Sequence, residues 1–252
     1  MIGIMAAMHD ELKRIVTMLE NVKEEKVGHK TVYVGRLNKQ AVVVVFSGWG
    51  KVASASTATM LIERYAVLKL IFTGVAGAIA DDLEIGDIVI GETFVQHDMD
   101  CAEMLGIQRF EIPLLSLIEI TASTEESKLA YQAAEKYISD DFKGKVDPNE
   151  LSSLGVKNPT VHRGMIATGD QFINSKEQQQ VLLKSFPQLL AVEMEGAAVA
   201  QVAYEYSLPF SVIRVISDKA DEDSEIDFPR FTKQIASYFT AGIINQLFLI
   251  NN

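Results

Sequence analysis

The sequence predicts an α/β fold in which a mixed β-sheet is covered by helices on both faces. Two observations support this prediction: short apolar runs alternate with longer segments of helical spacing, and the alternation continues along the whole chain. The composition agrees, because 48% of the 252 residues are hydrophobic, which is ample for a large core. No internal repeat or low-complexity tract interrupts the pattern, and we therefore predict a single domain over residues 1–252.

The predicted strands are short runs of aliphatic and β-branched residues. They cover 2–7, 31–37, 41–46, 68–72, 88–95, 161–167, 189–192 and 210–217. The turn between the second and third strands is expected at Asn38 and Lys39. Residues 74–77, Gly-Val-Ala-Gly, have the composition of a tight turn after the fourth strand.

The predicted helices have apolar residues three and four positions apart, or runs of small residues that pack closely. They cover 10–19, 52–65, 125–138, 175–186, 196–206 and 231–249. Ser175 is expected to cap the fourth of these helices.

Two segments fall outside the alternation. Residues 97–118 are irregular yet unusually apolar for a loop, and a partner subunit would cover such a surface. Residues 139–159 are polar, and we expect them to form a solvent-facing connection, a probable surface insertion and not a domain linker.

The charge balance and the cysteine content argue against several kinds of partner. With 34 acidic and 23 basic residues the net charge is −11, and such a surface repels nucleic acid and anionic membranes. Cys101 is the single cysteine, so neither an intrachain disulfide nor a thiolate metal cluster is expected. Residues 1–8 lack the basic lead of a signal peptide, and no apolar run reaches the roughly 18 residues of a membrane span. A cytoplasmic protein is the expectation.

Two carboxylates, Glu193 and Glu195, lie between the predicted strand 189–192 and the alanine-rich segment 196–206. Burying an ionised carboxylate without partners is costly, so this placement needs a reason. Ligands of α/β proteins bind at the carboxyl ends of strands, which makes both residues candidates for holding a polar ligand. The alternative is that the acids stabilise the positive end of the helix dipole.

Together with Glu11 and Asp218, these residues form a set of carboxylates suited to hydrolysing acetal-like bonds. One acid would protonate the leaving group while another activates water. Phosphate-loop, dinucleotide-binding and nucleophile-elbow motifs do not occur. His97, Asp98 and Asp100 offer metal-ligating atoms, but no second cluster accompanies them, and we predict no metal. Their alternative role is hydrogen bonding to the backbone of their own loop.

Several blocks along the chain occur together in a recognisable order. They are Gly3-Ile4-Met5-Ala6-Ala7-Met8 with Glu11, Ser47-Gly48-Trp49-Gly50-Lys51-Val52, Thr73-Gly74-Val75-Ala76-Gly77, Gly86-Asp87-Ile88-Val89, His97-Asp98, Thr168-Gly169-Asp170-Gln171-Phe172-Ile173, Val192-Glu193-Met194-Glu195 and Arg214-Val215-Ile216-Ser217-Asp218. In this order they resemble the 5'-methylthioadenosine/S-adenosylhomocysteine nucleosidase family of the purine nucleoside phosphorylase superfamily. The resemblance covers the chain except residues 139–159.

The resemblance implies a nucleoside phosphorylase-like fold, a three-layer α/β sandwich with a central mixed, partly barrel-like β-sheet flanked by helices. It implies a hydrolase that cleaves the N-glycosidic bond of 5'-substituted adenine nucleosides such as 5'-methylthioadenosine, S-adenosylhomocysteine and 5'-deoxyadenosine. The products would be adenine and the free 5'-substituted ribose, as in methionine salvage and the recycling of adenosylmethionine by-products. The family needs no cofactor and is a homodimer.

The resemblance also implies roles for single residues. Glu11 matches the carboxylate that activates the attacking water, Asp218 the acid that protonates purine N7, and Ser217 a residue that orients this acid. The other matches concern substrate binding. At the ribose the resemblance implies Glu195 at the hydroxyls, with Glu193 and Arg214 beside it, and Met194 under the sugar; at the base it implies Phe172 stacked on adenine and Ile173 contacting the purine edge. Around the 5' group it implies Met8, Trp49 and Phe228, together with Cys101, Leu105 and Pro113 lent by a second subunit.

Two positions depart from the family pattern. Val75 stands where serine is common, which removes a polar contact near the ribose. Trp49 stands where a smaller aliphatic residue is common, and it would either narrow the 5' pocket or stack on a longer substituent. For Val75, Met8 and Trp49 the alternative is core packing.

Three other functions remain open at this point. A phosphate-dependent purine nucleoside phosphorylase is disfavoured because a carboxylate at Glu11 repels phosphate, although Arg214 and the turn at Gly74 could cradle an anion. A futalosine or aminofutalosine hydrolase would share the same adenine-ribose core. A binding or storage protein could keep the fold without turnover.

Overall fold

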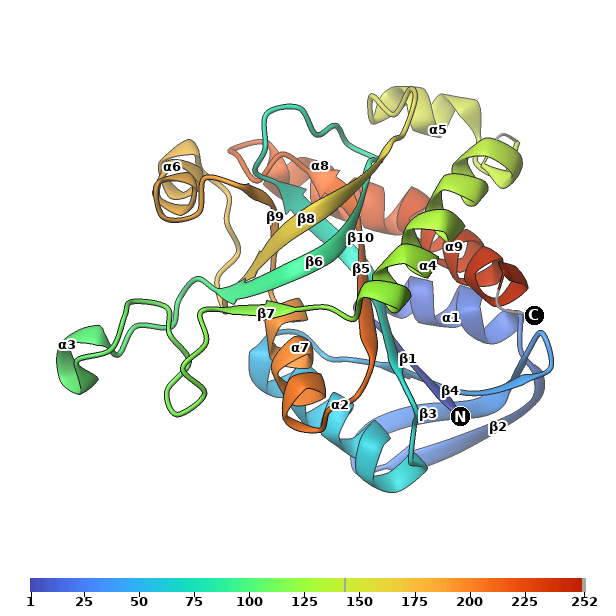
Figure 1. The fold of residues 1–252 in the computed structure, drawn as a ribbon. Helices are drawn as coiled ribbons and strands as arrows, with labels where there is room; N and C mark the ends of the chain where they lie inside the picture. The colour runs from blue at the N-terminus through green and yellow to red at the C-terminus, as the bar shows by residue number, and fades with distance from the viewer. Residues whose placement is uncertain (143, 251–252) are drawn as a thin grey trace.

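A ten-stranded mixed β-sheet forms the centre of the computed structural model, which describes residues 1–142 and 144–250 (Figure 1). Its strands, in sheet order, are β10 (Phe210–Asp218), β6 (Ile88–Gln96), β8 (Val161–Thr168), β9 (Leu189–Glu193), β5 (Leu70–Ala78), β1 (Ile2–Ala6), β4 (Gln40–Phe46), β3 (Lys30–Leu37) and β2 (Glu20–Val27). The short β7 (Glu119–Thr121) pairs with β6. Because β10 also pairs with β5, the five strands from β10 to β5 close into a barrel. The expected mixed, partly barrel-like sheet is confirmed.

The register inside the barrel brings distant strand ends together. β5 runs parallel to β10 and antiparallel to β9. Gly77 of β5 consequently pairs with Val192 on one side and with Asp218 on the other. A Cβ atom at position 77 would lie 2.9 Å from Oδ1 of Asp218, so glycine is required for this close approach. The ends of β9 and β10 therefore flank a single backbone position of β5.

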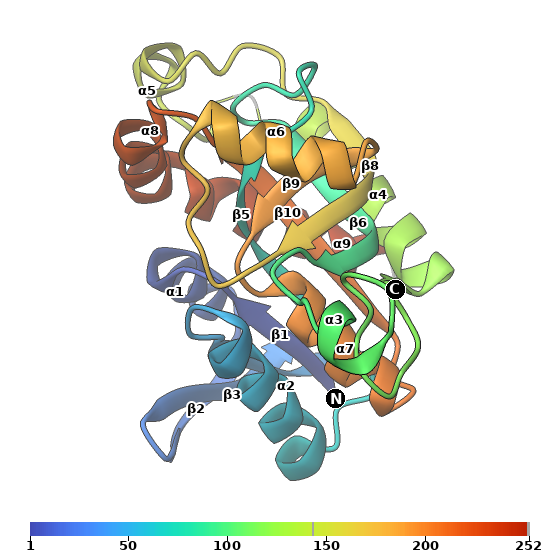
Figure 2. The same cartoon turned by 90° about the vertical axis from the view of Figure 1, so that its left-hand side faces the viewer.

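Helices cover both faces of the sheet, which gives the expected three layers (Figures 1 and 2). One face packs against α1 (His9–Thr17), α4 (Thr124–Lys136) and α9 (Ser237–Ile250), whose apolar side chains share one core cluster. The other face packs against α2 (Lys51–Tyr65) and α7 (Gly196–Glu205). The alanines of α7 let it approach the sheet closely. Helix α6 (Lys176–Ser185), capped by Ser175 as predicted, packs on the barrel through Leu182.

Several elements differ from the prediction, and three of the differences bear on the sheet and its helices. Strand β2 was not expected, because its sequence Glu-Asn-Val-Lys-Glu-Glu-Lys-Val has no apolar alternation; it pairs with β3 at the edge of the sheet. The predicted turn at residues 74–77 is wrong, since these residues continue β5 and are buried. The single helix predicted over 231–249 is a π-helical turn (Thr232–Ala236) followed by α9, and a further helix that was not predicted, α8 (Ser224–Phe231), precedes this turn.

Residues 139–159 contribute to the core, although their polar composition indicated a solvent-facing connection. A π-helical turn (Tyr137–Asp141) and α5 (Pro148–Ser153) lie in and beside this segment. Its apolar side chains Phe142, Val146, Leu154 and Val156 are buried in the same cluster as α4 and α9. Isolated apolar residues spaced through a polar stretch carry no clear periodicity, which explains the difference.

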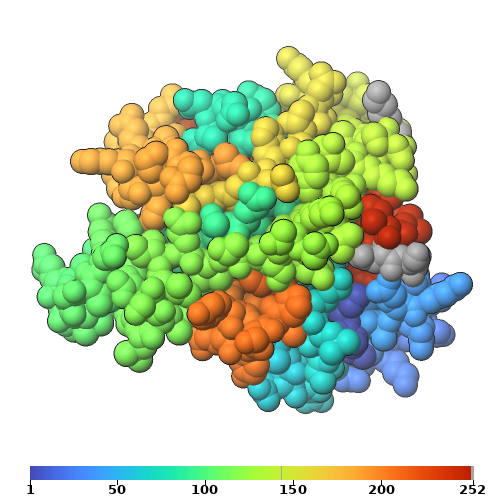
Figure 3. All heavy atoms as spheres, viewed as in Figure 1, coloured from blue at the N-terminus to red at the C-terminus, as the bar shows by residue number. Residues whose placement is uncertain are grey.

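Residues 97–118 project from the body of the molecule as an arm that includes α3 (Ala102–Leu105) (Figures 1 and 3). Phe110 anchors the arm by packing against Phe186 of the barrel side, with ring centroids 4.7 Å apart. Met104, Leu105 and Leu114 are exposed on it. Within the described ranges, no helix combines the length and the apolar character needed to cross a lipid bilayer.

Candidate active site

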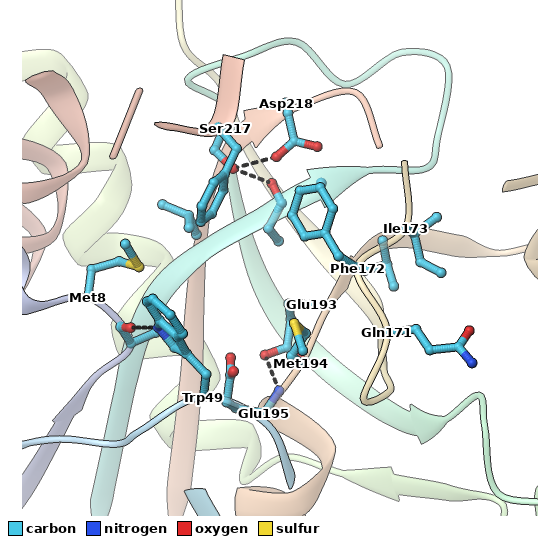
Figure 4. Close-up of a pocket in the computed structure, with 16 residues that line it drawn as sticks. Met8, Trp49, Gln171, Phe172, Ile173, Glu193, Met194, Glu195, Ser217 and Asp218 are labelled. Atoms are coloured by element: carbon cyan, nitrogen blue, oxygen red, sulfur yellow. Dashed lines mark hydrogen bonds between the residues drawn. The ribbon is translucent and has the colours of Figure 1, made fainter. Parts of the chain in front are cut away.

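A cavity of about 240 Å³ lies where β5, β9 and β10 meet (Figure 4). Most of the residues predicted for substrate binding line it, together with Asp218. The lining residues are Ala7, Met8, Trp49, Val75, Ala76, Gly77, Gln171, Phe172, Ile173, Val192, Glu193, Met194, Glu195, Ser217, Asp218 and Phe228. The structure thus brings together side chains from both ends of the sequence.

Glu193 ends β9, and internal donors hold its carboxylate. The backbone N–H groups of Glu195 and Gly196, at the start of α7, donate to Oε2 at 3.1 and 2.8 Å. The Thr168 hydroxyl donates to Oε1. Arg214 donates to Oε2 through Nη2 at 2.6 Å and through Nε at 3.2 Å. Glu193 therefore stabilises the start of α7, which is the alternative role that the sequence suggested for these acids, and it also neutralises the buried Arg214.

Glu195 is the N-cap residue of α7 and presents its carboxylate to the cavity. Its Oε1 accepts the backbone N–H of Gly50 at 2.9 Å, and its Oε2 lies 4.0 Å from Nη2 of Arg214. Burial and the charge on Glu193 raise the pKa of this carboxyl, while Arg214 opposes the shift. An acceptor held in this way suits a ligand that offers hydroxyl groups.

Arg214 lies behind the cavity wall and is not among the described lining residues, although a substrate-binding role was predicted for it. Its side chain is fully buried, with the guanidinium over the Phe72 ring at 4.1 Å. Gly74, its partner in register, makes room for it, since a Cβ there would lie 3.1 Å from Nη1. The arginine compensates the charges of Glu193 and Glu195, which explains why β10 carries a cation in the core.

Asp218 ends β10 on the side of the cavity opposite Glu195 in the view of Figure 4. The Ser217 hydroxyl donates to Oδ2 at 2.7 Å, and the Ala220 N–H donates to Oδ1 at 2.9 Å. Burial raises the pKa of this carboxyl, against the opposing effect of these hydrogen bonds. A carboxyl that holds its proton more firmly is suited to act as an acid.

Glu11 is fully buried and, like Arg214, lies outside the described cavity lining. It is the N3 residue of α1, and its Oε2 accepts the N–H of Met8, a lining residue, at 3.1 Å. Its Oε1 accepts the hydroxyl of Thr240 in α9 at 2.8 Å. Burial raises the pKa of Glu11 to about 7, although Thr240, Arg214 and the Met8 N–H each lower it. A carboxyl with this pKa can exchange protons near neutral pH.

Aromatic side chains form two apolar walls of the cavity. Trp49 is 64% exposed, yet its indole N–H donates to the Ala7 carbonyl at 3.0 Å and its ring packs edge-on against Phe46. Phe172 lies across the cavity in Figure 4 and packs edge-on against Phe228, with ring centroids 5.6 Å apart. A flat apolar ligand fits between such walls.

The three residues predicted to come from a second subunit lie on the arm. Cys101 and Pro113 are half-buried and Leu105 is exposed. Within the described chain they do not line its own cavity. Of the three residues weighed as metal ligands, the two aspartates are in ion pairs, Asp98 with Lys51 at 2.6 Å and Asp100 with Arg109 at 3.1 Å.

Sequence reasoning missed four residues that support the site: Gly50, Thr168, Gln171 and Thr240. Gly50, Thr168 and Gln171 stand inside the matched blocks but have no charge or strong local signal. Thr240 lies in an apolar helix far along the chain, and nothing in its surroundings indicates contact with Glu11. Only the packing of α1 against α9 reveals it.

The fold and this arrangement of buried carboxylates beside an aromatic slot define a nucleoside-cleaving enzyme. The family profile described as the phosphorylase superfamily matches residues 1–248. A 5'-methylthioadenosine/S-adenosylhomocysteine nucleosidase of Oceanobacillus iheyensis is 32% identical over 248 residues, which are 98% of each chain. The chain belongs to the 5'-methylthioadenosine/S-adenosylhomocysteine nucleosidase family and is an N-glycosyl hydrolase.

Solved structures agree on the fold. The 5'-methylthioadenosine/S-adenosylhomocysteine nucleosidase of Neisseria meningitidis, in complex with methylthio-immucillin-A, has a TM-score of 0.85 at 31% identity, covering 98% of this chain and 97% of that one. The futalosine hydrolase of Helicobacter pylori has a TM-score of 0.82 at 31% identity, covering 98% and 96%. Relatives with different substrate names therefore share this architecture.

Proposed function

We propose that the chain hydrolyses the N-glycosidic bond of 5'-substituted adenine nucleosides, with 5'-methylthioadenosine and S-adenosylhomocysteine as substrates. The observation that carries this proposal is the pair of buried carboxylates, Glu195 and Asp218, on opposite sides of one aromatic-walled cavity. Methylthio-immucillin-A, the compound bound in the Neisseria structure, supports the same substrate class.

In the proposed mechanism, Asp218 donates its proton to N7 of adenine while the bond between C1' and the base breaks. Phe172 stacks on the purine, and the Ile173 backbone contacts its edge. Glu195 accepts hydrogen bonds from the ribose hydroxyls as the sugar becomes oxocarbenium-like. Glu11 takes one proton from the attacking water, and the hydroxide adds to C1' on the face opposite the base. No cofactor takes part.

The direct test is adenine release from 5'-methylthioadenosine in phosphate-free buffer, followed by chromatography. We expect equal amounts of adenine and 5-methylthioribose, with no change in rate when phosphate is added. Strict phosphate dependence would identify a phosphorylase. A stoichiometric complex that returns unchanged nucleoside would identify a binding protein.

Thr240→Val tests Glu11 as the base. The hydroxyl of Thr240 stabilises the charged form of Glu11, so its removal raises the pKa of Glu11 further. A hydrogen bond to a charged group is worth about 1.5 kcal/mol, which corresponds to about one pH unit. Since the base must be deprotonated, the acid limb of the pH profile of kcat/KM should move to higher pH by that amount. Thr240→Ser keeps the hydroxyl, so its pH profile should match that of the wild-type chain. An acid limb that does not move in Thr240→Val would contradict the role of Glu11 as the base.

Trp49→Ile tests whether this indole limits the 5' substituent. The ring is held by its hydrogen bond to Ala7 and by its packing on Phe46, so a long substituent would have to displace it. We expect the ratio of kcat/KM for S-adenosylhomocysteine to that for 5'-methylthioadenosine to rise about tenfold. Trp49→Phe keeps a ring and should change the ratio less. A ratio that falls in the isoleucine variant would instead assign Trp49 to stacking on the longer substituent.

The Helicobacter futalosine hydrolase favours a second substrate class, aminofutalosine-type nucleosides with a bulky 5' group. A panel of adenine nucleosides that includes 5'-deoxyadenosine separates these possibilities by their kcat/KM values.

We also propose that the chain forms a homodimer through the exposed apolar arm, with Cys101, Leu105 and Pro113 lent to the partner's pocket. A cytoplasmic role in methionine salvage completes the proposal.

A further inference from the structure

Two loops lie beside the cavity: the loop before α2, which carries Trp49, and the loop after β8, which carries Phe172. Three charged residues outside the cavity lining, Lys51, Asp98 and Asp170, join these two loops. We propose that Asp98 is a positioning residue, which acts with Lys51 and Asp170 to fix the separation of these loops. We call the three residues the Asp98 bridge. The inference rests on the proposed function of the cavity, because it concerns how that cavity holds the nucleoside.

The Asp98 bridge is a closed ring of hydrogen bonds. Oδ1 of Asp98 accepts from Nζ of Lys51 at 2.6 Å, and Oδ2 accepts the N–H of Asp170 at 2.9 Å. Asp170 returns the contact, since its Oδ1 accepts the N–H of Lys51 at 2.8 Å. The bridge therefore joins three separate segments: the start of α2, the loop after β6 and the loop after β8.

The bridge is more shielded than an ordinary surface ion pair. The side chains of Lys51 and Asp98 are 18% and 22% exposed. Burial tends to raise the pKa of Asp98, but Lys51 and the Asp170 N–H outweigh it and lower the pKa below its usual value. Nζ of Lys51 also donates to Gln96, which in turn donates to Gln201 of α7 at 2.7 Å. The bridge is thus anchored to a packed helix, so it can hold its position.

On the ribose side, the bridge acts through Gly50. This residue precedes Lys51, and its N–H donates to Oε1 of Glu195 at 2.9 Å. Its φ of +84° is unfavourable for other residues, and a Cβ there would lie 2.9 Å from Oδ1 of Asp170. The backbone that orients the Glu195 carboxylate is therefore set by contact with Asp170.

On the base side, the bridge acts through the aromatic walls. Trp49 lies two residues before Lys51, and Phe172 lies two residues after Asp170. Both rings line the cavity from these two loops. The width of the slot between them consequently depends on the bridge, in which Asp98 adds a second link to the direct contact between Lys51 and Asp170. Small errors in the position of substrate-binding groups are costly, on the order of 100-fold for about 1 Å.

The test compares Asp98→Ala, Asp98→Asn and Lys51→Met in the full chain, with 5'-methylthioadenosine as substrate. We expect kcat/KM to fall about 10- to 100-fold in Asp98→Ala, mainly through a higher KM. Asp98→Asn keeps an acceptor for the Asp170 N–H, so its kcat/KM should fall less. The double variant Lys51→Met with Asp98→Asn should have a kcat/KM no lower than that of the poorer single variant, because both substitutions remove the same ion pair.

The matched control is Glu126→Ala. Glu126 pairs with Lys69 at 2.9 Å, and these side chains are 16% and 19% exposed, close to the values of the bridge. This pair lies at the start of β5, whereas the cavity lies at its end. We expect KM to stay within twofold of the wild-type value. Partial unfolding would lower kcat and leave KM unchanged, so the KM increase separates positioning from lost protein.

A second measurement does not depend on turnover. Trp49 is the single tryptophan of the chain, so its fluorescence anisotropy decay reports on one of the two bridged loops. We expect a larger nanosecond depolarisation in Asp98→Ala than in Glu126→Ala, with the oligomeric state of each variant checked by sedimentation. Equal anisotropy decays, or equal KM values, in these two variants would overturn the inference. A wild-type chain that releases no adenine would instead refute the proposed function, and the anisotropy comparison would still decide the bridge.

Discussion

Asp218→Asn is expected to reduce kcat for 5'-methylthioadenosine by about 10²- to 10⁴-fold, with KM changed only a few-fold. Asparagine has nearly the same shape and still accepts the Ala220 N–H, but it cannot give a proton to the leaving base. The raised pKa of Asp218 keeps the acid protonated to a higher pH than usual, and activity declines as the pH rises through it. The asparagine variant should lose this basic limb of the pH profile.

The measurement is steady-state adenine release across pH, with nucleoside affinity measured separately by calorimetry. Asp223→Asn is a suitable control, because Asp223 lies nearby on the exposed start of α8. It should retain turnover within twofold. Near-normal turnover in Asp218→Asn, with binding intact, would remove Asp218 from the role of acid.

Arg214→Met is expected to lower the free energy of unfolding by about 3–5 kcal/mol. Methionine fills much of the space of the arginine stem, but it leaves Glu193 and Glu195 without the cation that compensates them. Both carboxylates are at most 7% exposed, so water replaces the lost partner poorly. Urea denaturation of the wild-type and variant chains, fitted with a common slope, measures the difference.

The control for Arg214→Met is Arg163→Met. Arg163 pairs with Glu92 at 3.5 Å, and these side chains are 49% and 44% exposed. An exposed pair contributes about 0–1 kcal/mol, so this variant should unfold nearly as the wild-type chain does. Methionine keeps much of the packing of Arg214 but removes its charge. Equal losses of stability in the two methionine variants would therefore show that the charge of Arg214 does not contribute to the free energy of unfolding.

The elements best predicted from the sequence are those whose pattern reports burial directly. The first part of β5, residues 70–72, and residues 189–192 of β9 are uninterrupted apolar runs, and these runs identify the two strands. Strand β2 was missed because an edge strand exposed on both faces needs no apolar residue. The glycines of residues 74–77 indicated a turn, yet Gly74 and Gly77 are small because Arg214 and Asp218 pass close to the strand.

The candidate site could be predicted as a set of residues but not as an arrangement. The carboxylates Glu195 and Asp218 stand out in sequence because each lies close to the end of an apolar run, where an acid needs partners. Glu11 lies in the first turn of α1, where acids are common, and stands out only through the matched blocks. The internal partners of Glu193 could not be predicted, since Arg214 lies on another strand and its contact depends on barrel closure. For the same reason the hydroxyl of Thr240 gave no signal before the packing of α9 was known.

The charged edge strand β2 has a consequence for solubility. The open end of a sheet can recruit a strand from another copy and start aggregation, unless charges discourage the pairing. Glu20, Lys23, Glu24, Glu25 and Lys26 lie along this outermost strand, and most of it is exposed. The barrel protects the other end of the sheet by closing on itself. Concentrated solutions of the folded chain should therefore stay free of fibrils.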